Sequence, residues 1–205
     1  MEEKNDLASL WIERRYIDGR KPDTSFTLFG EKFSTPVMAA FTSLGEKKIA
    51  ENEGEEAAKD VYRAGIACFT DVEEEKAFIQ MAATGAKIIS IIKPYADNRI
   101  IIEKIKKAEE QGAFAVGIDI AGAFDHNGEY AIISGQHMAP KSMEEIGMIV
   151  KNASRPFVIK GILSMQDAYK CLEAGAEGIL ISRPYPFLSA PPLSRVLHTQ
   201  YSFYN

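Results

Sequence analysis

One turn recurs four times in the sequence, and it constrains the fold more than any other feature. Each time, an amphipathic helix pattern ends at a glycine, and an apolar run begins within two residues. A glycine just after a helix readily adopts the left-handed backbone conformation that ends the helix. The four glycines are Gly65, Gly85, Gly112 and Gly175.

The apolar runs after these turns are typical of buried parallel strands. They are short and rich in isoleucine, valine and phenylalanine, and their apolar residues are consecutive, as in a strand covered on both faces. The prolines that open Pro36–Phe41 and Pro156–Ile162 are tolerated at a first strand position, so these segments are predicted as two further strands, which makes six. Alternating helices and strands predict an α/β fold with right-handed crossovers.

The spacing of the units leaves two α/β architectures open. A strand-helix unit of roughly twenty to thirty residues suits a (β/α)8 barrel or a doubly wound sheet, and a complete barrel needs about 200 to 250 residues. The chain has 205 residues. We therefore predict one domain at 1–182, an incomplete TIM-type (β/α)8 barrel of about six units with an N-terminal arm.

Residues 183–205 depart from this pattern, with four prolines and no acidic residue. We predict an irregular tail, which either covers an exposed sheet edge or results from a truncated or frame-shifted gene. An incomplete barrel has two unpaired edges, so the chain is expected to form a homo-oligomer or to be of low stability.

Composition excludes several classes of function. The net charge of −5 forms no basic stripe, so nucleic acid is not predicted as a partner. No run of eighteen apolar residues and no signal-like N-terminus is present, so we expect a cytoplasmic protein that does not bind membranes. Cys68 and Cys171 stand alone in apolar stretches, which predicts buried, reduced thiols and no metal site.

Polar residues follow several predicted strands at the end where barrel enzymes keep their chemistry. Lys160 ends an apolar strand just before a glycine, so its amine is placed at the C-terminal mouth of the barrel. Thr42 and Ser43 follow the first strand, Thr70 ends the second and Lys93 follows the third. Lys160 either serves a ligand there or packs its stem on the barrel rim with its ammonium group in water.

Three stretches resemble one family of flavoproteins. "PFVIKGILSMQDAYKCLEAGAEGILIS" is similar to the fifth strand, helix and sixth strand of the FMN-dependent α-hydroxy-acid oxidases and dehydrogenases, which include glycolate oxidase, lactate oxidase and flavocytochrome lactate dehydrogenase. "DTSFTLFGEKFSTPVMAAFTS" resembles the start of their barrel, and "DNRIIIEKIKKAEEQGAFAVGIDI" resembles their third helix and fourth strand. The resemblance covers roughly residues 20–182.

The resemblance implies FMN as the cofactor and the oxidation of a small 2-hydroxy acid to a 2-oxo acid. It gives Lys160 a catalytic role beside the flavin, where positive charge stabilises the reduced ring. It also implies cofactor contacts for Thr42, Ser43, Thr70 and Lys93 as well as for Lys160 itself.

Two further positions match the family's phrases only in part. Asp119 matches the aspartate of a Thr-Val-Asp phrase, although Gly117 stands in the place of the threonine. Asp119 could equally cap the loop that follows it. That loop, 120–140, is long enough to be a lid and contains His126 and His137, either a candidate acid or base or simply solvated.

One motif of the family is missing. Relatives follow the sixth strand with Ser-Asn-His-Gly-Gly-Arg, which supplies the base and the arginine that binds the substrate carboxylate, whereas Ser182 is followed here by Arg183-Pro184-Tyr185. "GILISRPYPF" also resembles the end of the family's eighth strand, as an internal deletion would leave it. The sequence therefore leaves open three functions: FMN-dependent hydroxy-acid oxidation, a non-catalytic barrel remnant for binding or assembly, and another flavin- or phosphate-binding barrel enzyme.

Overall fold

The computed structural model describes residues 16–41 and 53–182. Thr42, Ser43 and the tail at 183–205, all of which carry sequence predictions, lie outside these ranges. The centre of the fold is a parallel sheet of six strands. They are β3 (Ala39–Phe41), β4 (Ala67–Thr70), β5 (Lys87–Ile92), β6 (Ala115–Asp119), β9 (Phe157–Lys160) and β10 (Gly178–Leu180).

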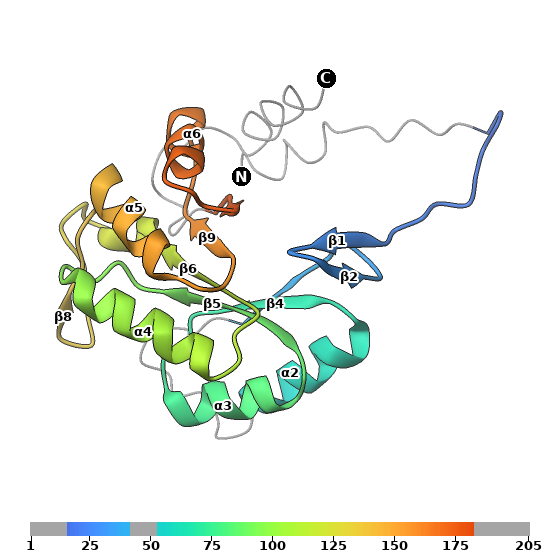
Figure 1. The fold of residues 1–205 in the computed structure, drawn as a ribbon, viewed down its shortest axis with the longest axis horizontal. Coiled ribbons are helices and arrows are strands. Elements are labelled where there is room, and N and C mark those ends of the chain that lie inside the picture. Colours follow the sequence, from blue (N-terminus) through green and yellow to red (C-terminus); the bar gives the residue numbers. More distant parts are fainter. Residues whose placement is uncertain (1–15, 42–52, 183–205) are drawn as a thin grey trace.

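The strand order decides between the two architectures that the sequence leaves open. The order in the sheet is β10-β9-β6-β5-β4-β3, so each of these strands pairs with the next one along the chain. A doubly wound sheet reverses direction at a switch point, whereas a barrel winds in one direction only. The sheet curls as part of a barrel (Figure 1), and the predicted incomplete (β/α)8 barrel with six strands is confirmed.

Five helices link these strands and cover the outer face of the sheet (Figure 1). They are α2 (Glu53–Ala64), α3 (Glu75–Ala83), α4 (Asn98–Glu110), α5 (Met143–Asn152) and α6 (Met165–Glu173). The larger apolar core lies between helices and sheet, and both cysteines are buried there as free thiols, as predicted. None of the helices in the described ranges is long and apolar enough to cross a membrane.

The predicted helix ends are also confirmed. Gly65, Gly85, Gly112 and Gly175 all have positive φ, between 65° and 93°. Ser142 caps α5 in a full capping box: its hydroxyl accepts a hydrogen bond from the backbone of Glu145, whose carboxylate accepts one from the Ser142 backbone. The cap ties the start of α5 to a fixed point at the mouth end of the sheet.

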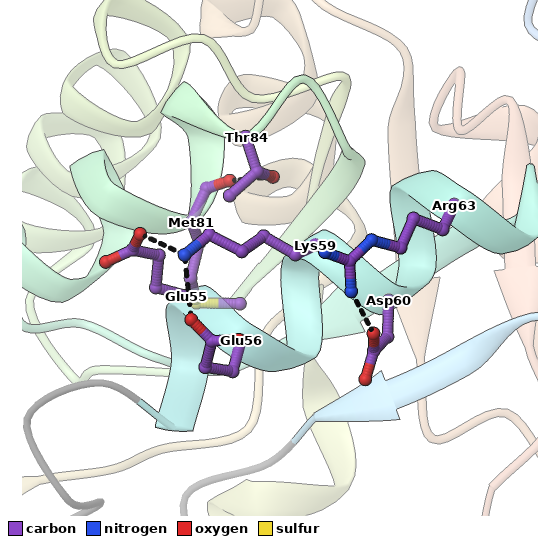
Figure 2. Close-up of polar contacts among 7 residues, drawn as sticks. All are labelled: Glu55, Glu56, Lys59, Asp60, Arg63, Met81 and Thr84. Carbon is purple, nitrogen blue, oxygen red and sulfur yellow. Dashed lines mark hydrogen bonds and ion pairs between the residues drawn. The ribbon is translucent and has the colours of Figure 1, made fainter.

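The outer face of α2 carries ion pairs between exposed side chains. Lys59 pairs with Glu55 and Glu56, both at 2.7 Å, and Arg63 pairs with Asp60 at 3.1 Å (Figure 2). The Asp60 and Arg63 side chains are 78% and 71% exposed. Exposed pairs of this kind contribute about 0 to 1 kcal/mol each.

Two hairpins were not predicted. In the first, β1 (Phe26–Leu28) and β2 (Glu31–Phe33) flank a turn at Gly30, and Phe29 packs on Phe114 with ring centroids 5.9 Å apart. Because Phe29 also packs against the inner residues of the sheet, this hairpin covers the N-terminal end of the barrel interior.

The second hairpin lies in the long loop after β6. The loop opens with the 3₁₀ turn η1 (Ile120–Ala123) and contains β7 (Ile132–Ile133) and β8 (Gln136–His137). The backbone of His137 accepts a hydrogen bond from Ala96 at 2.8 Å, which fastens the loop to the turn after β5. The side chains of both candidate histidines in this loop are exposed.

Candidate active site

The two faces of the curled sheet differ in what they bury. Successive side chains of a strand point to opposite faces. Ile88 on β5 faces the helices, whereas Ile89 and Ile91 face the barrel interior together with Ala115 and Val158. By the same alternation, Asp119 and Lys160, the last residues of β6 and β9, face the interior.

A small cavity lies on this inner face at the C-terminal ends of the strands. Its volume is about 90 Å³. All six strands contribute to its wall, for example through Ala40, Phe69, Ile91, Asp119, Lys160 and Leu180. The cavity is therefore apolar except at its charged rim, as expected at the catalytic end of a barrel.

Lys160 and Asp119 form an ion pair at this rim. The two residues are register partners on neighbouring strands, and the Lys160 Nζ donates a hydrogen bond to Asp119 Oδ2. Their side chains are 21% and 10% exposed. The other carboxylate oxygen, Asp119 Oδ1, is buried and has no hydrogen-bond partner within the described ranges.

Local packing fixes the two strand ends relative to each other. Gly161 follows Lys160 and has a φ of 98°, a backbone conformation that residues other than glycine rarely adopt. A Cβ atom at Gly161 would lie 2.6 Å from the Cβ and 2.8 Å from the backbone nitrogen of Ala121. The turn η1, which starts right after Asp119, therefore rests directly on the end of β9.

The remaining predicted site residues are less directly placed. Lys93 pairs with Asp71 at 2.7 Å, both largely buried at the same end of the sheet. Thr70 lines the cavity, while its hydroxyl accepts a hydrogen bond from the Val72 backbone at 3.2 Å. Lys160 and Thr70 therefore line one cavity, whereas the Lys93 ammonium group is paired with Asp71.

The sequence did not predict the acidic partners of the two lysines. It offered Asp119 either as the match to a family aspartate or as a loop cap, and Asp71 received no role. A signal was nevertheless present, because Asp119 and Lys160 both end apolar strands that the barrel order makes neighbours. Charged residues at neighbouring strand ends share one rim, so opposite charges there are expected to pair.

The strand that carries Asp119 is pressed against β9. A Cβ atom at Gly117 would lie 2.2 Å from the Val158 carbonyl oxygen, which no real contact allows. Gly117 is therefore required by the backbone approach, and this chain has no room for the threonine of the family phrase without moving a strand. The same close approach holds Asp119 beside Lys160.

The inner face carries residues that could hold one end of a flavin ring. Pockets that enclose a ligand of this size typically measure about 300 to 1,000 Å³. The 90 Å³ cavity is too small to enclose the ring, so a flavin would have to be held at the open mouth, where Lys160 and the apolar residues of the cavity wall lie. No cluster of three or more potential metal ligands occurs among the residues that the structure describes.

A singly wound parallel sheet with its ionisable groups at the C-terminal strand ends defines a barrel protein of the α/β class. The family model of the FMN-dependent dehydrogenases matches residues 1–141 and 121–183, and the chain belongs to this family. The predicted family is thus confirmed, and the match disfavours the other flavin- or phosphate-binding barrels.

Curated relatives agree with this assignment. Glycolate oxidase 3 of Arabidopsis thaliana is 26% identical, over 84% of this chain and 56% of its own length. Glycolate oxidase of Spinacia oleracea is 24% identical with the same coverage. The chain spans about half the length of these relatives (56%).

Solved structures show the same fold. A mandelate oxidase variant with a C4a-OH-FMN adduct superposes with a TM-score of 0.73 at 19% identity, covering 98% of this chain and 65% of the other. A mandelate oxidase variant with (S)-mandelic acid gives a TM-score of 0.71 at 20% identity, covering 89% and 58%.

Proposed function

We propose that the chain binds FMN across the mouth of its half barrel and serves the oxidation of a small 2-hydroxy acid. The observation that carries the proposal is Lys160, an amine on the inner face at the C-terminal end of β9, beside an apolar cavity. The family match supports the cofactor, and the glycolate and mandelate oxidases among the similar proteins support the substrate class.

When bound, FMN accepts the two electrons that leave the substrate carbon. The side chains of this chain contribute the surroundings. Lys160 would offer N–H donors to the ring, on which negative charge develops during reduction. Phe69, Ile91 and Leu180 line the cavity with apolar surface that would keep water away from a ring held at the mouth. Asp119 holds the lysine at the rim.

Oxidation also requires a base for the substrate hydroxyl. None of the described residues that line the cavity is a histidine, and Asp119 Oδ2 already accepts a hydrogen bond from Lys160. This observation supports a second candidate function, a flavin-binding or assembly protein that performs no turnover on its own. Among the described strands, β3 and β10 each pair with one neighbour and so leave an open sheet edge. These edges support the predicted homo-oligomer, which stays a prediction.

One experiment separates these functions. The protein is loaded with FMN, made anaerobic and mixed with glycolate, lactate or mandelate, while the flavin absorbance at about 450 nm is followed. Bleaching by a hydroxy acid establishes oxidation. Bound flavin without bleaching establishes the non-catalytic alternative, and a protein that binds no FMN refutes the proposed site.

A further inference from the structure

We infer that Asp119 keeps Lys160 as one half of a neutral ion pair even when a ligand is bound, so that the site offers a flavin a compensated lysine rather than a free cation. The inference rests on the proposed flavin site and makes Asp119 a positioning residue within it.

Asp119 has no hydrogen-bond donor other than Lys160 among the described residues. Its Oδ1 is buried without a hydrogen-bond donor in the described part of the chain, and its Oδ2 receives only the Lys160 ammonium group. If Lys160 moved away to a ligand, a carboxylate that is 10% exposed would be left without a donor among the described residues. Isolated buried charges are heavily penalised, so the pair stays closed.

The backbones that carry the two residues are fixed relative to each other. Asp119 and Lys160 are paired in register at the ends of adjacent strands. The contact of Gly161 with Ala121 locks the backbone directly after both residues. The strands and the 3₁₀ turn therefore keep the two side chains within reach of each other.

The pair still leaves the lysine able to contact a ligand. An ammonium group has three N–H donors, of which Asp119 takes one, so two remain for ring oxygens or nitrogens. The electrostatic effect differs, because opposite charges at contact distance largely cancel at a ring a few ångströms away. The reduced, negatively charged ring is then stabilised less than it would be beside an unpaired lysine.

The isosteric variant Asp119→Asn tests this cancellation, since asparagine keeps the shape and can still accept from Lys160 but carries no charge. In the FMN-loaded protein we expect the ratio of reduced to oxidised flavin at a fixed potential to rise about tenfold, which is about 30 mV in midpoint potential for two electrons. Asp60→Asn is the matched control, because it removes a carboxylate from the exposed pair with Arg63 (Figure 2) and is expected to leave the potential unchanged. A purely structural role would not raise the potential, so an unchanged or lower value in Asp119→Asn overturns the inference.

A second measurement needs no flavin and separates failure of the inference from failure of the proposed function. Lysines of the apo protein are acetylated with an N-hydroxysuccinimide ester and quantified by peptide mass spectrometry. We expect Lys160 to react slowly in the wild type and faster in Asp119→Asn, while Lys93, similarly exposed at 20% and held by Asp71, does not change. If the wild type binds no FMN, the proposed flavin site is refuted, and the labelling alone then tests whether Asp119 holds Lys160. Equal reactivity of Lys160 in both proteins overturns the inference.

Discussion

Replacing Lys160 with methionine removes the one donor that Asp119 has among the described residues while keeping most of the apolar stem. Removing one partner of a buried pair costs about 3 to 5 kcal/mol, because the other charge remains buried. Lys160 is 21% exposed, so water can replace part of the lost ammonium group. We therefore expect Lys160→Met to lower the free energy of unfolding by about 3 kcal/mol, the lower end of that range.

The double variant is a stricter test than the single one. Asp119→Asn/Lys160→Met leaves no charge behind, so it should recover about 2 kcal/mol of the loss. Urea unfolding followed by circular dichroism gives both values. Lys59→Met is the control, since the Lys59 side chain is 37% exposed and its pairs are worth at most about 1 kcal/mol. A double variant no more stable than the single one refutes the account.

Three other substitutions test other parts of the structure. Gly117→Ala should cost about 3 kcal/mol in urea unfolding, because its Cβ would lie 2.2 Å from a carbonyl oxygen of β9, whereas Gly147→Ala, with nothing within 4 Å, should be neutral or stabilising. Equal effects would contradict this packing. Ser142→Ala should lose about 1 kcal/mol with the capping box, and a loss no larger than that of a surface serine would speak against the cap. Burial, and then the nearby Asp167, raise the pKa of the Cys171 thiol from 9.0 to about 11, so its contribution to stability is complete below pH 9 and is lost as the pH rises toward about 11. Unfolding of the wild type and of Cys171→Ala across this window should show the steeper decline in the wild type, and parallel curves would rule out this thiol as the cause.

Local signals explain why so much of the fold could be predicted. The glycine turns and the apolar strands each depend on a few adjacent residues, and all of them are present in the structure. The order of the strands could not be read from these signals, because a barrel and a doubly wound sheet use the same units. The order is decided by which strands pair across the chain.

The elements that the sequence missed are short and weakly patterned. The strands β7 and β8 have two residues each, and they are held by contacts to the turn after β5 rather than by an alternating pattern of their own. The hairpin β1 and β2 has only three residues a strand and gains its stability from aromatic packing on Phe114. Tertiary contacts of this kind leave no periodic signal in a sequence.

For the candidate site, the sequence could predict positions, whereas the roles of the residues stay predictions. Strand-end position correctly brought Lys160 to the mouth, because parallel strands all end on one side of the sheet. The pairing of Lys160 with Asp119 depends on the register between β6 and β9, and that register joins residues 41 positions apart, which residue types alone do not specify.

The most direct test of the central claim is an equilibrium titration of FMN fluorescence with the wild type and with Asp119→Asn/Lys160→Met, the variant expected to stay folded without the lysine. The account predicts saturable quenching by the wild type and binding at least about tenfold weaker by the double variant, since a charge-assisted contact of the ring is lost. Equal affinities in the two folded proteins, or no binding by the wild type, would contradict a flavin site built on Lys160.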